Sequence, residues 1–285
     1  MDHIGEFFPD SPIWFRWLGR LAAPLFFYAL AVGFQHTRNR KKYLLRLYLA
    51  NVGMVFFNQI MCMLQRKLDY VAYQPKNHNI FTTLFCAGVL ICIWESRKEK
   101  KKFFTYIGIY IFWQAMVMGL AILAEAFDYV WRGNALLQTV LRTNYIFPLL
   151  GGIWDAEGGV FFIVLGIWLY CAVEKKGKLA LHYILFCGAY MFMCQGDILY
   201  RIMSRFSFWG YHKLADVIYF GSSFVGIPLG TSDLSLLTEF YQWMMIGALP
   251  IMLACNGKRG KSLKWLFYAA YPLQFLVLYG ISYYK

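Results

Sequence analysis

The segment from His36 to Arg46 is the densest polar stretch in the chain, and it lies between two apolar runs. A neutral imidazole can act as a general base. Guanidinium and ammonium groups bind phosphates through charge-assisted hydrogen bonds, so the same segment suits the phosphates of a nucleotide cofactor. The alternative is a basic loop that only sets membrane topology and carries an interfacial histidine. The cations are Arg38, Arg40, Lys41, Lys42 and Arg46.

A second imidazole, His3, directly follows Asp2 near the start of the chain. A carboxylate beside an imidazole can fix its tautomer and its orientation, which suits a general base. His78, His182 and His212 lie at the ends of apolar runs or in loops, where interfacial roles are more common than catalysis.

Carboxylates recur near the ends of the apolar runs on the side opposite the basic loops. They suit an amine-bearing or sugar acceptor, but acids also cap helix N-termini, where the helix dipole favours negative charge. For Asp155 and Glu157 capping is the better interpretation. The carboxylates are Glu125, Asp128, Asp155, Glu157 and Asp197.

Common catalytic signatures are missing from the sequence. It contains no GxSxG, Walker, HExxH or DxD-like pattern, and its cysteines and histidines lack the spacing of a zinc site. We therefore expect no metal. A helical enzyme, a transporter and an assembly scaffold remain.

The composition indicates that lipid is the solvent around these residues. The 285 residues are 60% hydrophobic and 15% charged, against roughly a quarter charged in an ordinary soluble domain. The net charge of +13 falls in short clusters between apolar runs. Because nucleic-acid binding needs a continuous basic face, we expect a lipid-bilayer partner and no nucleic acid.

Apolar stretches of about 20 residues predict an all-α, polytopic transmembrane bundle of about eight spans in one domain over residues 1–285. Four strongly basic connections, at 38–42, 96–102, 174–178 and 256–264, alternate with less basic loops. The positive-inside rule therefore places all four in the cytoplasm and both termini outside. The predicted spans are 17–37, 43–64, 79–95, 103–124, 157–173, 179–195, 234–255 and 265–284.

Two more apolar segments, 135–151 and 216–230, are short and interrupted by Pro148, Pro228 and glycines. Both cannot span without breaking the charge alternation. We predict re-entrant or interfacial segments, because irregular backbone is tolerated at membrane depth where protein or a watered cavity covers it. Ordinary outer loops with a surface helix are the alternative.

The opening of the chain, DHIGEFFPDSPIWFRWLGRLAAPLFFYALAVGFQHTRNRKKYLLRL, resembles the TraX family of F-pilin acetylase-like membrane proteins. The resemblance is strongest over residues 2–46, and shorter pieces such as NIFTTLFCAG, NGKRG and KWLFYAAYPLQFLVLY also fit. The matching positions are Asp2, His3, Arg20, Pro24, His36, Thr37, Arg38, Tyr43, Arg46, Asn79, Asn256, Gly257, Tyr271 and Pro272.

The resemblance implies a bacterial inner-membrane acyltransferase within the wider transmembrane acyltransferase superfamily. Acetyl would pass from cytoplasmic acetyl-CoA to an amine or hydroxyl of a pilin, peptide or cell-envelope glycan. His3, supported by Asp2, is the expected general base, and His36 is expected to organise the CoA entrance. The expected ligands of the CoA phosphates are Arg38, Arg40, Lys41, Lys42 and Arg46.

Two departures from the family pattern favour a non-catalytic scaffold of a conjugation or envelope assembly. Where the family usually reads Tyr-Pro-Leu-His, this chain has Gln274 in place of the imidazole. The family also has an apolar helix ahead of its Asp-His element, and an apolar segment upstream of Met1 would favour the enzyme. A small-molecule transporter, with the two broken segments as half-helices, is the other alternative.

Overall fold

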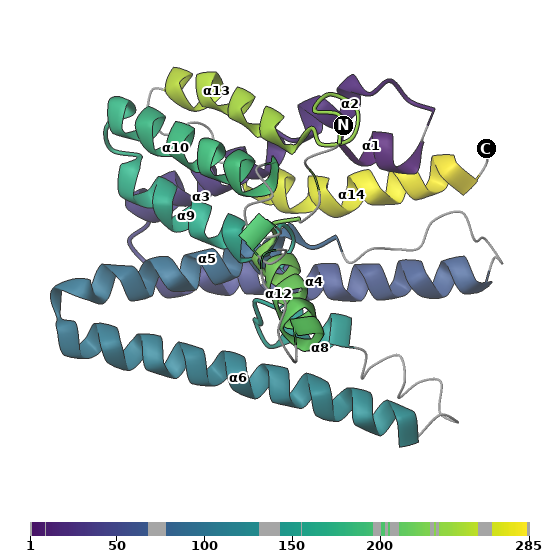
Figure 1. Ribbon diagram of the computed structural model, residues 1–285, viewed down its shortest axis with the longest axis horizontal. Coiled ribbons are helices and arrows are strands. Elements are labelled where there is room, and N and C mark those ends of the chain that lie inside the picture. Colours follow the sequence, from purple (N-terminus) through teal and green to yellow (C-terminus); the bar gives the residue numbers. More distant parts are fainter. Residues whose placement is uncertain are drawn as a thin grey trace. The chain divides into compact units, whose positions relative to one another are not determined.

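Every regular element that the computed structural model describes is a helix (Figure 1). The prediction of an all-α protein is therefore confirmed for that part of the chain. The described residues are 2–8, 10–67, 78–130, 143–154, 156–195, 201, 202, 205, 211–228, 231, 234–255 and 264–283.

Among the described residues, five helical segments are long and apolar enough to cross a membrane. The first joins α2 (Trp14–Gly19) to α3 (Ala22–His36), and the third joins α5 (Ile80–Glu95) to the 3-10 turn η1 (Ser96–Lys98). The other three lie in α4 (Arg40–Lys67), α6 (Lys100–Val130) and α10 (Lys176–Gln195).

Three further apolar helices are shorter. They are α9 (Gly159–Ala172), the pair η2 (Gln242–Gly247) with α13 (Ala248–Ala254), and the apolar part of α14 (Lys264–Tyr283). The eight segments fall on the eight predicted stretches. Only five qualify by length and composition, so a multi-pass membrane protein is established while the count of eight spans stays a prediction.

The chain divides into two compact units, whose boundaries fall just before His36, the last residue of α3, and within α9. Unit 1 combines residues 1–35 with 168–285, and unit 2 covers 36–167. That these units belong to one membrane domain remains a prediction.

Unit 2 is organised by an antiparallel pair of helices, α4 and α5. The Arg40 guanidinium at the start of α4 meets Glu95 at the end of α5, and Asn51 further along α4 meets Thr82 near the start of α5. The short helix α8 (Thr143–Leu149) packs on α4 and α6. The buried apolar side chains between these helices include Leu47, Met54, Phe81, Leu84, Ile91 and Val117.

Unit 1 joins the two ends of the chain. The helix α1 (Asp2–Phe7) packs on α2 and α14, while η2 and α13 pack on α10. The Tyr183 hydroxyl, fully buried on α10, donates to the Met245 carbonyl at 2.6 Å and fixes η2 against that helix. The segment predicted at 216–230 lies mostly in α12 (Tyr211–Val225), which ends before Gly226 at φ 86°.

Candidate functional site

His3 lies in unit 1 on α1, where its Nδ1 atom is 3.4 Å from the Glu6 carboxylate. Both side chains are largely buried, with 15% and 13% of their surfaces exposed. Residues three apart share a helix face, which is why α1 brings them together. The structure therefore provides an imidazole–carboxylate pair at this position.

Glu6 was missed by the sequence analysis, which supported His3 with its neighbour Asp2. The Asp2 side chain lies outside the described residues. Adjacent residues of a helix point in different directions, whereas the i, i+3 spacing of His3 and Glu6 was a signal available in the sequence. Reading residues 2–7 as a helix would have identified the pair.

An aromatic wall from α14 covers the His3 ring. Phe275 lies 4.4 Å and Tyr271 6.4 Å from it between ring centroids, and the His3 and Tyr271 rings are nearly perpendicular at 82°. Phe7, on the same short helix as His3, packs edge-on against Tyr279 at 4.9 Å. The pair thus lies in a partly dehydrated setting, where charge interactions act with less screening than in water.

Gly5 lets a cation approach the backbone of α1. A Cβ atom at this position would fall 2.8 Å from Cδ and 2.9 Å from Cγ of Arg16. The Arg16 side chain, near the start of the first membrane-length segment, therefore packs directly on α1 at Gly5.

Arg20, which matches the family motif, lies in that first segment. Its Nη1 donates to the Gln242 amide oxygen at 2.9 Å, and its guanidinium lies 5.1 Å from the centre of the Tyr241 ring. Ionisable residues inside membrane segments are costly and usually serve function or assembly. Here Arg20 connects the first segment to η2.

The predicted cofactor residues lie at one end of unit 2. His36, the last residue of α3, is exposed, as are Arg38, Lys41 and Lys42. Arg46 is half-buried and donates through Nε to the Lys42 carbonyl at 3.1 Å.

Arg40 differs from its neighbours because it is engaged with protein groups. It bonds Glu95 at 2.9 Å through Nη2 and the Thr37 carbonyl at 3.0 Å through Nη1. It therefore holds α4 against α5, and the sequence-based assignment of a phosphate-binding role to this residue stays untested.

Unit 2 also contains a buried polar centre that the sequence analysis missed. Asn51 donates to the Pro148 carbonyl at 2.6 Å, and its amide oxygen accepts from Asn79 and Thr82, each at 2.7 Å. Asn51 lies 11 residues beyond Arg40, roughly 17 Å along the helix. This is about half of a hydrocarbon core roughly 30 Å thick.

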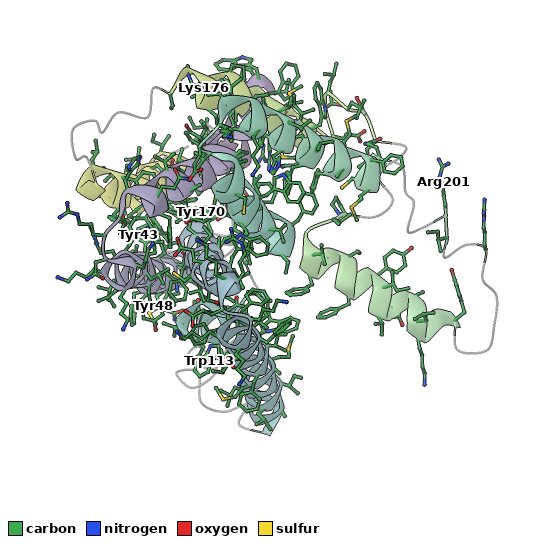
Figure 2. The ribbon with its side chains drawn as sticks, turned by 90° about the vertical axis from the view of Figure 1, so that its left-hand side faces the viewer. Tyr43, Tyr48, Trp113, Tyr170, Lys176 and Arg201 are labelled. Carbon is green, nitrogen blue, oxygen red and sulfur yellow. The ribbon has the colours of Figure 1, made fainter. Side chains whose placement is uncertain are left out.

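The carbonyls that follow Pro148 are also satisfied by side chains. Tyr48 donates to Leu149 at 2.7 Å, Trp113 to Leu150 at 2.9 Å and Gln114 to Gly151 at 3.1 Å. The donors Tyr48 and Trp113, labelled in Figure 2, come from α4 and α6. The backbone at the end of α8 is thus bonded to side chains of α4 and α6. That the segment 135–151 is re-entrant stays a prediction, and its residues 135–142 lie outside the described residues.

The other polar candidates are less informative. Glu157 is half-buried and its carbonyl accepts from Thr83 at 3.1 Å, while the His182 ring lies 5.1 Å from that of Trp168. The side chains of several candidates lie outside the described residues, namely Glu125, Asp128, Asp155, Asp197 and His212.

Several membrane-length helices, with polar side chains buried among them, define a multi-pass helical membrane protein. A family model described as TraX protein matches residues 1–191. Because this match covers 191 of 285 residues, the chain belongs to the TraX family. Comparisons with curated proteins and with solved structures find no match.

The family match includes most of the features described above. It covers the His3–Glu6 pair, the basic end of unit 2 and the buried polar centre. The aromatic wall of α14 lies beyond it, as do α12 and α13.

Proposed function

We propose that this TraX-family protein is a membrane acetyltransferase that uses acetyl-CoA and has His3 as its general base. The observation that supports this role most directly is the His3–Glu6 pair packed against the aromatic wall. An imidazole oriented by a carboxylate is the arrangement that acyl-transfer enzymes use to activate a nucleophile.

The proposed chemistry needs one proton carrier. With Nδ1 facing Glu6, Nε2 of His3 takes a proton from the acceptor's amine or hydroxyl as that atom attacks the thioester carbonyl. The carbon–sulfur bond then breaks, and the imidazolium returns the proton to the CoA thiolate. Glu6 orients the ring and does not touch the reacting atoms, so it is a positioning residue.

The proposed donor site is the exposed basic segment at the start of unit 2, where Arg38, Lys41 and Lys42 are available for phosphates. His36 adjoins this segment and would orient the cofactor. Acetyl-CoA is made in the cytoplasm, so the proposal places the protein in the bacterial inner membrane with its basic loops inside. The acceptor is a pilin, a peptide or a cell-envelope glycan.

Gln274 supports the choice of His3 over the imidazole that the family pattern has in α14. A carboxamide does not take up a proton near neutral pH, so Gln274 cannot act as a base. It lies on α14 between Tyr271 and Phe275, the two residues that face the His3 ring. The proton-transfer role at this wall is therefore assigned to His3.

The buried polar centre argues against the transporter alternative. Transporters often bind cations with free carbonyls at the ends of broken helices. In this protein, the carbonyls of Pro148, Leu149, Leu150 and Gly151 accept hydrogen bonds from side chains of neighbouring helices. That arrangement fixes the backbone and leaves it poorly suited to bind a passing ion.

Acetyl transfer to glucosamine, which offers an amine and hydroxyls, tests the proposal with protein purified in lipid nanodiscs. Removing a positioned general base lowers turnover by about 10²- to 10⁴-fold. We expect this loss in His3→Ala with unchanged acetyl-CoA affinity, and weaker acetyl-CoA binding in His36→Ala.

The two histidine variants also separate the alternatives. Normal turnover in His3→Ala, together with normal acetyl-CoA binding and no transfer in His36→Ala, would reverse the two roles. If neither substitution changes transfer to glucosamine or to a peptide amine, neither histidine is the general base. If the wild type transfers acetyl to neither acceptor, the enzyme proposal is wrong and the scaffold becomes the better interpretation.

A further inference from the structure

Unit 2 has a second group of exposed cations besides those of residues 38–46. It begins at η1, directly after Glu95, and extends into the first turn of α6. The sequence analysis interpreted this segment only as a topology-setting loop. Its exposed cations are Arg97, Lys98, Lys100, Lys101 and Lys102.

The Arg40–Glu95 ion pair brings the two basic segments to the same end of unit 2. The guanidinium nitrogen and the carboxylate oxygen are 2.9 Å apart although the residues are 55 positions apart in the chain. Because η1 continues directly from Glu95, the segment 97–102 starts beside the segment 38–42. Figure 1 shows α5 and α6 joined by this turn.

The surroundings of these cations favour an anion. Residues 40–42 and 100–102 occupy the first turns of α4 and α6, and neither turn contains an acidic residue. Glu99, directly before α6, pairs with Lys102 at 2.7 Å and neutralises only that one cation. The helix dipole disfavours cations at helix N-termini and favours anions there. A ligand with several negative charges would offset both the crowded cations and the two dipoles.

The basic loop of unit 1 behaves differently. Lys176 donates to the Leu253 carbonyl at 2.7 Å and Lys178 to the Cys171 carbonyl at 2.8 Å. These carbonyls lie near the ends of α13 and α9, where lysines stabilise a helix. Lys176 and Lys178 also lie in the first turn of a helix, α10, and in unit 2 Arg97 likewise donates to the Trp94 carbonyl at 3.1 Å. The two loops therefore differ in their lysines, since no such bond from Lys98 or Lys101 is found among the described residues.

We propose that residues 38–46 and 97–102 form one binding surface for the phosphates of the acetyl-CoA donor, with Arg40 and Glu95 as the brace between its halves. This inference rests on the proposed acetyltransferase function. CoA carries a 5′-diphosphate and a separate 3′-phosphate, and a surface built from two segments suits two separated groups. Arg97, held 4.8 Å above the Trp94 ring, has a fixed orientation within this surface.

The test compares variants that remove two charges each. Lys98→Gln with Lys101→Gln changes the second segment, and Lys175→Gln with Lys261→Gln removes two charges from the basic loops of unit 1. Acetyl-CoA binding is measured in nanodiscs of zwitterionic lipid, with folding checked by thermal melting. The second-segment pair should raise Kd about tenfold, equivalent to two weakened charge-assisted contacts, while the control pair changes it less than twofold.

A second probe, 3′-dephospho-acetyl-CoA, strengthens the test. If the second segment binds one of the separated phosphates, the Lys98/Lys101 pair should change the preference for acetyl-CoA over this probe. The Arg38→Gln with Lys41→Gln pair should then have the opposite effect on the preference. If neither double variant changes the preference for acetyl-CoA over 3′-dephospho-acetyl-CoA, the two segments do not bind different phosphate groups.

Other outcomes would overturn the inference in distinguishable ways. Wild-type affinity in Lys98/Lys101 with weak binding in Arg38/Lys41 would restrict the donor site to the first segment and leave the proposed function intact. If the Lys98/Lys101 variant binds acetyl-CoA normally but no longer associates with phosphatidylglycerol vesicles, the second segment is a lipid-headgroup surface instead. Absence of acetyl-CoA binding in the wild type would overturn both proposals.

Discussion

The two units use buried polar groups for different purposes. Unit 2 buries neutral amides and hydroxyls, and these hold the irregular backbone at the end of α8 inside a set of spanning helices. Unit 1 instead buries most of an imidazole and a carboxylate against aromatic rings. Neutral polar groups commonly stabilise membrane helices, whereas ionisable ones mark functional sites. These differences favour a fold-stabilising role for the polar centre of unit 2 and a chemical role for α1.

Replacing Asn51 should give the largest loss of stability in unit 2. Asn51→Leu removes one side-chain partner each from the Pro148 carbonyl, Asn79 and Thr82, while the Pro148 carbonyl keeps its bond from the Gly151 N–H. Since each buried group left unsatisfied costs about 1–3 kcal/mol, we expect a loss of about 3 kcal/mol in the free energy of unfolding. Denaturation of the purified protein in mixed micelles measures it.

The exposed Asn39 offers a control for the Asn51 substitution. Its amide oxygen accepts only from the Lys42 backbone at the start of α4 among the bonds described. Asn39→Ala should therefore cost about 1 kcal/mol, as expected for loss of a helix cap. Equal losses in the two variants would show that the buried centre contributes nothing special.

The Gly151→Ala substitution should give the next largest loss of stability. It has φ 65°, and an added Cβ would lie 2.8 Å from Cε1 of Phe85. Gly151→Ala should therefore destabilise unit 2 by about 2 kcal/mol, through a left-handed backbone and a close contact. Gly108→Ala, in α6 with no atom within 4 Å of the added Cβ, should be neutral or stabilising. Similar melting temperatures for both variants would contradict the tight packing of this loop.

Glu6 tests the chemical role of unit 1. Glu6→Gln keeps the size of the side chain but removes its charge, so turnover should fall about tenfold, equivalent to roughly 1.4 kcal/mol in the barrier. KM for acetyl-CoA and the melting temperature should stay unchanged, which a merely structural role would not produce. Asp2→Asn is the matched control, and a larger loss there would support the sequence-based pairing with Asp2.

The sequence predicted the helices better than the contacts between them. Spans of about 20 apolar residues are local patterns, so the membrane-length helices were recognisable from the sequence. The carbonyls of residues 148–151 find donors 37 to 101 positions away in the chain. Such long-range pairing has no local signature, and Asn51 and Gln114 therefore looked like ordinary polar residues in a span.

The basic loops illustrate the same limit. Alternation of charge predicted that residues 38–42 and 96–102 lie on one side of the membrane. It could not predict their adjacency, because this depends on which helices pack together. The Arg40–Glu95 pair supplies that information in unit 2.

The smallest expected effect concerns the Arg40–Glu95 pair. Its side chains are 28% and 31% exposed, so water screens their attraction, and exposed pairs contribute about 0.2–1 kcal/mol. A double-mutant cycle with Arg40→Gln and Glu95→Gln should give a coupling in this range for the free energy of unfolding.

The same variants should weaken acetyl-CoA binding more than they lower stability, because the brace also sets the spacing of the two basic segments. If Arg40→Gln weakens binding and Glu95→Gln does not, Arg40 binds the cofactor itself, as the sequence analysis predicted, and does not act as the brace. If neither variant alters binding, the pair is only a packing contact between α4 and α5.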